Sequence, residues 1–326
     1  MSEIFKLATP AQPQEFTGER LTSAVSGQIQ VEHYHRYFLA REYCRGKDVL
    51  DIASGEGYGS ALLAQTARSV VGVEIDDDTV AHARDAYPGP RFLVGSATSI
   101  PIEDASVDIV VSFETLEHFY DHDAFLKEVR RVLRPEGMLI LSTPDRDLYF
   151  PPTGVNQFHV NELTRVELEA LLGRFFLHRY LYFQRAVLGS VLILDPSASA
   201  SGAPIVFERR NDTYYEQTVG MPRAPYIIAL ASDAPLSVPS TTVYVERSEP
   251  YSHIAQMEQS LQAAETAFHS EEAHLRDEFA AAETAFHSEE ARLRDELAHA
   301  INQRHSRTFR GRISGALYRL LSRGKK

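Results

Sequence analysis

Short apolar runs alternate with amphipathic segments through the middle of the chain. Five runs are short, rich in β-branched residues and bounded by turn or charged residues, which predicts strands: KDVLDI, SVVGVEI, RFLVG, VDIVVSF and GMLILST. Between them, YGSALLAQTA, DDTVAHARDAY and DHDAFLKEVRRVL have apolar residues three and four apart, which predicts helices. Strands and helices in alternation predict an α/β fold, with a mostly parallel sheet that has helices on both faces.

Further elements flank this region. QIQVEHYHRYFLAREYC and NELTRVELEALLGRF predict helices, and HRYLYFQRAVLG and PYIIALAS predict strands. DPSASASGAP, between the last two, has the composition of a mobile loop. The expected divisions are an N-terminal arm (1–29), a globular domain (30–235), a linker (236–250), a long acidic helix (251–300) and a basic tail (301–326).

The predicted long helix contains an 18-residue repeat, AAETAFHSEEAHLRDEFA followed directly by AAETAFHSEEARLRDELA. Its apolar residues recur at spacings of three, four and seven and form one stripe: Leu261, Ala264, Phe268, Leu275, Phe279, Ala282, Phe286, Leu293 and Leu297. Eighteen residues in five turns is 3.6 per turn, so the stripe runs nearly straight. The pattern predicts a coiled-coil-like helix that pairs with another copy, with a single solvated helix as the alternative.

The last segment differs sharply in charge from the helix before it. Residues 301–326 hold eight Lys or Arg and no Asp or Glu, whereas residues 251–298 hold eleven Asp or Glu and three Arg. Phe309, Ile313 and Leu317 fall on one helical face together with Leu320 and Leu321, a pattern typical of a helix in the interface of anionic lipid. Docking on an acidic partner, such as a glycan-assembly protein, is the alternative.

Composition excludes several classes of protein. The chain of 326 residues has a net charge of −12, which argues against a nucleic-acid binder. Cys44 is the single cysteine, so there is no internal disulfide and no cysteine cluster for zinc. The sequence shows no signal peptide and no apolar run of the roughly 20 residues that span a bilayer. We therefore expect a cytoplasmic protein, peripheral at the inner face of the membrane if the tail binds lipid.

The stretch VLDIASGEGYGS places a glycine loop directly after a predicted strand. A P-loop would need a Lys after its glycines, and none follows. A dinucleotide fingerprint needs its third glycine at Ser60, whereas Gly59 lies one residue early. Asp51, Glu56 and Glu74 surround the loop, and residues 49–67 contain no Lys or Arg. These carboxylates would repel a diphosphate and attract a cationic sulfonium, so the loop favours S-adenosylmethionine.

Several motifs in order resemble those of class I S-adenosylmethionine-dependent methyltransferases with a compact Rossmann-like domain: VLDIASGEGYGS, VVGVEID, FLVGSATSIPIEDASVDIVVSFETLEHF and LKEVRRVLRPEGMLILSTP. The resemblance covers roughly residues 30–235. It departs from the family pattern at Ala53, usually Gly, and at Ser96, usually Asp.

The resemblance implies a role for each matching residue. Asp51, Gly55 and Gly57 would contact the methionine part of the ligand, with Glu114 near its amino group and Arg36 a candidate partner for its carboxylate. A separate set would hold the nucleoside: Glu74 the ribose hydroxyls, Ile75 one face of the adenine, and Ser96 and Ala97 its edge.

Methyl transfer is an in-line displacement, so it needs alignment and, for some acceptors, a general base. His118 in ETLEHF and His159 in NQFHVNEL are the candidate catalytic residues, with Glu117, Asp121 and Glu162 at the rim. No metal is expected: a site made of His33, His35, His118 and His122 is rejected because the first two lie on different faces of a helix.

Aromatic and cationic residues near the expected mouth bear on the acceptor. Tyr149, Phe150, Tyr214 and Tyr215 would stack on sugar rings, and Arg209 and Arg210 would meet an anionic group. The long helix and basic tail resemble those of enzymes of bacterial surface-glycan (O-antigen) assembly, which favours a sugar on a lipid-linked or nucleotide-linked glycan. Two alternatives stay open: methylation of a diffusible quinone precursor or natural product, and a non-catalytic scaffold.

Overall fold

The computed structural model describes residues 10, 14, 21–25, 27–150, 156–187, 189–193, 202–211 and 213–245, and the backbone of 250–322 with part of its side chains. Most of the N-terminal arm and of the expected mobile loop, and most side chains of the basic tail, lie outside the described residues. The chain divides into two compact units, Met1–Val245 and Glu246–Lys326, which are described separately.

The first unit is built on one seven-stranded sheet, in the order β3-β2-β1-β4-β5-β9-β6. The strands from β3 to β5 are parallel, and β9 is antiparallel to both neighbours. The bounds are β1 (Asp48–Ile52), β2 (Ser69–Glu74), β3 (Arg91–Val94), β4 (Val107–Phe113), β5 (Leu133–Pro144), β6 (His178–Gln184) and β9 (Tyr226–Ser232). The predicted mostly parallel, Rossmann-like sheet is confirmed.

Helices cover both faces of the sheet and bury two apolar clusters. One face carries α1 (Gln28–Cys44), α2 (Tyr58–Ala64) and α3 (Asp77–Ala86). The other carries α4 (His122–Val132) and α5 (Arg165–Gly173). Side-chain caps start several of these helices, such as Asp76, which accepts from the Thr79 amide, and the capping box of Thr164 and Glu167. The central strands are buried on both faces, so their sequences are nearly continuous apolar runs.

Two regions differ from the simplest expectation. A hairpin of β7 (Ile205–Arg209) and β8 (Tyr215–Val219) forms where no strand was predicted. Its residues alternate between exposed and half-buried, so it lacks the apolar run that marks a core strand. In the expected linker, Thr242 is 2.9 Å from His35 and the Tyr244 ring lies 5.4 Å from Phe38, so these residues pack against α1.

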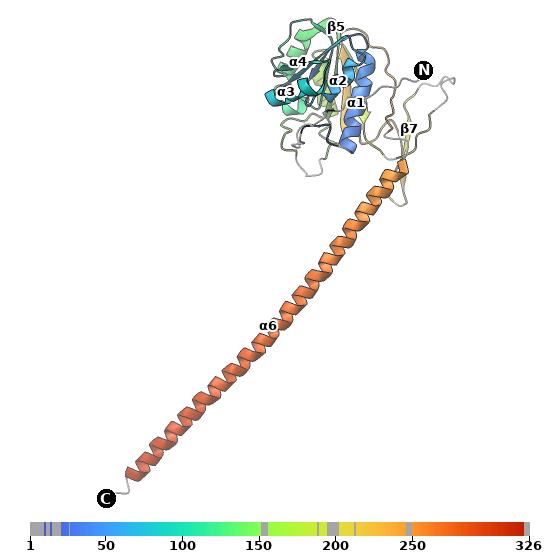
Figure 1. Ribbon diagram of the computed structural model, residues 1–326. Helices are drawn as coiled ribbons and strands as arrows, with labels where there is room; N and C mark the ends of the chain where they lie inside the picture. Colours follow the sequence, from blue (N-terminus) through green and yellow to red (C-terminus); the bar gives the residue numbers. More distant parts are fainter. Residues whose placement is uncertain are drawn as a thin grey trace. The chain divides into compact units, whose positions relative to one another are not determined.

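The second unit is one helix, α6 (Pro250–Ser322), of 73 residues (Figure 1). At about 1.5 Å per residue it is ~110 Å long, and the predicted long C-terminal helix is confirmed. The repeat-related Phe268 and Phe286 are 67% and 68% exposed. Pairs such as Arg276 with Glu272 brace the helix surface. Among the described residues, no helix is both long and apolar enough to cross a membrane.

Candidate active site

The glycine loop joins β1 to α2 at the carboxyl edge of the sheet. Ala53, Gly55 and Gly57 have φ angles of 56°, 52° and 99°, the left-handed region that glycine enters at least cost. A side chain on Gly57 would also come within 2.8 Å of the Phe92 ring. Gly55 has open space where a side chain would stand. The loop backbone is therefore shaped for close approach by a ligand, with Ala53 as the strained exception.

Glu74 ends β2 and ties it to the glycine loop. Its Oε2 accepts a hydrogen bond from the Gly55 amide at 3.1 Å, and its Oε1 accepts one from the Ile75 amide at 2.9 Å. The carboxylate is almost fully buried, whereas the next side chain, Ile75, is 66% exposed. An acidic group and an exposed apolar side chain thus follow one another at the edge where sheets of this kind bind ligands.

Asp51 lies at the carboxyl end of β1 and is fully buried. It accepts hydrogen bonds from the Ser60 hydroxyl at 2.6 Å and from the Tyr37 hydroxyl at 3.3 Å. Burial raises the pKa of Asp51 to about 7, and the charge of Glu74 adds to the shift. This carboxyl group therefore titrates near neutral pH.

Glu56 does not face the expected ligand side of the glycine loop. It is fully buried and accepts hydrogen bonds from the Gln14 amide at 2.9 Å and the Ser23 hydroxyl at 3.0 Å. Its charge is thus directed toward the N-terminal segment. The sequence argument from three carboxylates around the loop is corrected to two, Asp51 and Glu74.

Arg36 and Glu114 form a buried ion pair from elements far apart in the sequence. Arg36 Nη1 lies 3.1 Å from Glu114 Oε1, and Arg36 Nε donates to Gln184 Oε1 at 2.6 Å. The guanidinium lies 4.4 Å from the centre of the Tyr226 ring. Ser142 donates to Glu114 at 2.7 Å. Nη1 is engaged by Glu114, whereas Nη2 makes no hydrogen bond within the described residues, so it can still donate to an anionic ligand group.

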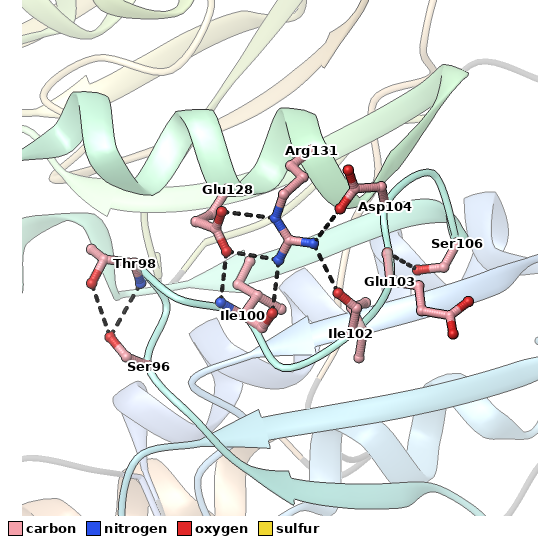
Figure 2. Close-up of polar contacts among 9 residues, drawn as sticks. All are labelled: Ser96, Thr98, Ile100, Ile102, Glu103, Asp104, Ser106, Glu128 and Arg131. Carbon is pink, nitrogen blue, oxygen red and sulfur yellow. Dashed lines mark hydrogen bonds and ion pairs between the residues drawn. The ribbon is translucent and has the colours of Figure 1, made fainter.

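The loop after β3 is held in place from α4 (Figure 2). Arg131 donates to the carbonyl oxygens of Ile100 at 2.7 Å and Ile102 at 2.9 Å, and pairs with Glu128. Ser96 is half-buried, and its hydroxyl oxygen accepts from the Thr98 amide at 3.2 Å. Ala97 beside it is also half-buried. The residues expected at the adenine edge thus belong to a braced loop.

The two candidate catalytic histidines are brought together across the sequence. The ring centres of His118 and His159 are 5.3 Å apart, with the rings perpendicular. His118 Nδ1 donates to the Phe158 carbonyl at 2.8 Å, and His159 Nδ1 lies 2.5 Å from Glu162 Oε1. Tyr149 stacks on His159 at 5.5 Å. Because a carbonyl oxygen only accepts, neutral His118 carries its proton on Nδ1 and its lone pair on Nε2.

Glu117, on the short helix η1 (Leu116–His118), is fully buried beside these histidines. Its Oε2 accepts from the Thr143 hydroxyl at 3.1 Å. Burial raises the pKa of Glu117 well above its ordinary range, and the charge of Glu114 raises it further.

The residues expected to hold the acceptor are only partly assembled. Tyr149 lies between His159 and Tyr226, 5.6 Å from the latter ring. Phe150, Tyr214 and Tyr215 are exposed. On the hairpin, Arg209 Nε donates to the Asn211 carbonyl, and Arg210 lies near Glu208 and Glu216 at 3.7 and 3.6 Å. The charge of Arg210 is therefore balanced by these carboxylates.

Local motifs gave no signal for Gln184 and Tyr226. Both lie in strands late in the chain, yet both contact the Arg36 side chain of α1. Only the strand order, which places β9 and β6 beyond β5, brings them there.

A parallel sheet with a glycine loop after its first strand and an acidic residue ending its second defines a Rossmann-like ligand-binding domain. Residues 50–141 match the family model described as a methyltransferase domain. A probable S-adenosylmethionine-dependent methyltransferase of Mycolicibacterium smegmatis is 41% identical over 160 residues, covering 48% of this chain and 62% of that protein. One of Mycobacterium tuberculosis is 44% identical over 164 residues, covering 48% and 58%.

Among solved structures, an S-adenosylmethionine-dependent methyltransferase of Thermotoga maritima, described as a possible histamine N-methyltransferase, has a TM-score of 0.45 and 17% identity. That match covers 63% of this chain and 91% of the other. The chain spans about three fifths of the length of the two mycobacterial relatives. Over about half of its length the chain is therefore similar in sequence to probable S-adenosylmethionine-dependent methyltransferases, enzymes whose methyl donor is S-adenosylmethionine.

Proposed function

We propose that the chain transfers the methyl group of S-adenosylmethionine to a hydroxyl group of a sugar on a lipid-linked or nucleotide-linked glycan. One observation carries the proposal: a continuous row of ring contacts leads from the donor side to the two histidines. Arg36 lies over Tyr226, Tyr226 contacts Tyr149, Tyr149 stacks on His159, and His159 contacts His118. Aromatic faces suit the C–H faces of sugar rings, and imidazoles at the end of the row suit a hydroxyl.

Different residues would hold the methionine part and the ribose of S-adenosylmethionine. The buried Arg36 donors would bind its carboxylate, and Glu114 its ammonium group. Glu74 would accept hydrogen bonds from the ribose hydroxyls. Asp51, buried behind the loop, would position it and add negative charge, because both its partners are protein hydroxyls.

The remaining donor contacts would be apolar or from backbone. Gly55 and Gly57 would let the loop approach the methionine part. The exposed Ile75 would cover one face of the adenine, and the braced loop at Ser96 and Ala97 would meet its edge.

The acceptor hydroxyl would lie against the two imidazoles. His118 is oriented by the Phe158 carbonyl and His159 by Glu162, so either ring presents Nε2 to take a proton. The proton would leave the acceptor as its oxygen bonds to the methyl carbon and the C–S bond breaks. Alignment would supply much of the rate, since displacement at carbon depends on an in-line approach.

The second unit would determine where this chemistry takes place. The exposed stripe of α6 would pair with a second copy of the chain, because an apolar row on a solvated helix is covered most simply by its own equivalent. The basic segment 301–326 would attach to anionic lipid at the inner face of the cell membrane. Sedimentation with anionic and neutral vesicles, for the full chain and one lacking 302–326, tests the attachment, and equal sedimentation of both would refute it.

The acceptor is tested by incubating the purified chain with labelled S-adenosylmethionine and either extracted glycolipid or small phenols. We expect label in the glycolipid, and loss of it in Tyr149→Ala with donor binding retained. Labelled phenols alone would favour the diffusible acceptor. No label in either, with donor bound, would favour the scaffold.

A further inference from the structure

Three side chains with metal-binding atoms lie close together, apart from the residues expected to bind S-adenosylmethionine. Glu117 and His118 are neighbours on η1, directly after β4, and His159 comes from the segment before α5. One potential metal-ligand atom from each residue lies within 4.8 Å of the other two. Within the described part of the chain, no other group of three such residues meets this condition. Sequence reasoning rejected a site of four histidines, whereas the fold joins one of these, His118, to a glutamate and a different histidine.

Both imidazoles are held in the orientation that metal-binding histidines require. His118 Nδ1 donates to the Phe158 carbonyl at 2.8 Å, and His159 Nδ1 lies 2.5 Å from the Glu162 carboxylate. Histidine ligands in metal sites commonly donate their second ring N–H to a carbonyl or carboxylate, which fixes the tautomer and leaves the other nitrogen as the ligand. Here that nitrogen is Nε2 in both rings.

Glu117 supplies an independent observation. Its side chain is fully buried, and its Oε1 has no hydrogen-bond partner among the described residues. The nearest cationic candidate, His159 Nε2, is 4.0 Å away, beyond hydrogen-bond distance. A buried carboxylate oxygen without a partner is costly, and a cation between it and the two imidazoles would remove that cost.

We propose that Glu117 Oε1, His118 Nε2 and His159 Nε2 bind one divalent transition-metal ion. Two imidazoles and one carboxylate suit Mn²⁺, Fe²⁺, Co²⁺ or Zn²⁺ and not the oxygen-seeking Mg²⁺ or Ca²⁺. Ligand atoms at about 2.1 Å from a metal stand roughly 3 to 3.5 Å apart, so Glu117 Oε1 and His159 Nε2, now 4.0 Å apart, must approach each other by roughly 0.5 to 1 Å. Three protein ligands leave positions open for acceptor oxygens.

This site rests on the proposed function and deepens it, because it names the group that activates the acceptor. A sugar hydroxyl bound to the ion would have a lowered pKa, so its proton would pass to solvent water in place of an imidazole. The oxygen would then bond to the methyl carbon, and the C–S bond would break with its electron pair left on sulfur. The open positions favour an acceptor with two adjacent oxygens, such as a sugar diol.

The test is a titration of the untagged, chelator-stripped full chain with Co²⁺, followed by its visible absorption and by competition with Zn²⁺. We expect one ion per chain, and loss of that site in Glu117→Gln, His118→Gln and His159→Gln. Glu162→Gln should weaken binding by roughly 10- to 100-fold, because it only orients a ligand. His178→Gln on β6 and His287→Gln on α6 are matched controls and should bind normally.

Folding and donor binding are measured in parallel. Zn²⁺ should raise the unfolding temperature of the wild type and not that of His159→Gln, while both bind S-adenosylmethionine alike. No Co²⁺ site in the wild type, or one that persists in the three ligand variants, overturns the metal proposal. In that event S-adenosylmethionine binding and glycolipid labelling by the stripped chain still test the proposed function by themselves. Full labelling without any metal would overturn the ion's role in activating the acceptor.

Discussion

The two units of this chain handle apolar and charged residues in opposite ways. In the α/β unit, apolar side chains from both sheet faces are buried, and buried charges such as Arg36, Asp51 and Glu74 are placed against specific partners. In α6, the described apolar residues of the stripe are exposed, and its charges pair along the helix surface. The apolar side chains of the first unit thus have partners within that unit, whereas the second unit presents an exposed apolar stripe.

Removal of α6 is expected to have the largest effect. Light scattering should give at least twice the monomer mass for the full chain and the monomer mass for a version ending at Val245, because the stripe is lost. Phe268→Glu with Phe286→Glu should also give monomers, since both positions are exposed parts of the stripe. His274→Glu, also exposed, lies off the stripe and serves as the control. Equal monomeric masses for both lengths would contradict the pairing of α6.

Substitution of Arg36 tests whether its buried charge binds the carboxylate of S-adenosylmethionine. Arg36→Met should weaken S-adenosylmethionine binding by about 1.5 to 3 kcal/mol, through loss of charge-assisted hydrogen bonds to the carboxylate. Calorimetry measures the change. Methylthioadenosine, which lacks the amino-acid part, is the control ligand, and the variant should bind it nearly as well as the wild type does. Equal weakening for both ligands would mean that Arg36 acts on the fold alone.

Arg131 tests whether the hydrogen bonds from α4 to the loop after β3 support ligand binding. Arg131→Ala removes its hydrogen bonds to Ile100 and Ile102 and its pair with Glu128, so urea unfolding should show a loss of about 1 to 2 kcal/mol. S-adenosylmethionine should bind several-fold more weakly. Arg130→Ala, the neighbouring residue on α4 with a pair to Asp233, should leave ligand binding unchanged. Similar ligand affinities in the two variants would contradict a role of the Arg131 contacts in ligand binding.

Asp51 gives the most specific effect, on the pH dependence of stability. Its folded pKa of about 7 lies above the roughly 3.9 of an unfolded Asp, so the folded state binds the proton more tightly. The stability it contributes is therefore complete below pH about 4 and is lost as pH rises to about 7. Urea unfolding across this range should show wild-type stability falling relative to Asp51→Asn. Parallel curves for the two proteins would contradict the raised pKa.

Much of the fold could be predicted from the local pattern of apolar and polar residues. The central strands are buried on both faces and are therefore continuous apolar runs, and the helices show one apolar face. The hairpin β7–β8 was missed because neither of its faces is part of a core. In the same way, the glycine loop was visible as a motif, but the direction of Glu56 depended on Ser23, in a segment without regular pattern.

The sequence could name candidate site residues where motif and strand end coincide, as at Asp51, Gly55 and Glu74, and their binding role stays a prediction. It was not predicted where distant elements meet. His118 and His159 were each noted as single candidates, yet their approach to Glu117 depends on how the segment before α5 returns to the end of β4. Tyr226 and Gln184 reach Arg36 through the strand order alone.

Calorimetry on Glu74→Ala tests whether the glycine loop and Glu74 bind S-adenosylmethionine. The wild type should bind one S-adenosylmethionine per chain and bind a nicotinamide dinucleotide far more weakly, because Asp51 and Glu74 repel a diphosphate. In Glu74→Ala, loss of the ribose hydrogen bonds should weaken S-adenosylmethionine binding by about 1 to 3 kcal/mol. The affinity of Glu74→Gln should lie between those of the wild type and Glu74→Ala. Unchanged affinity in Glu74→Ala, or tighter binding of the dinucleotide by the wild type, would contradict the account.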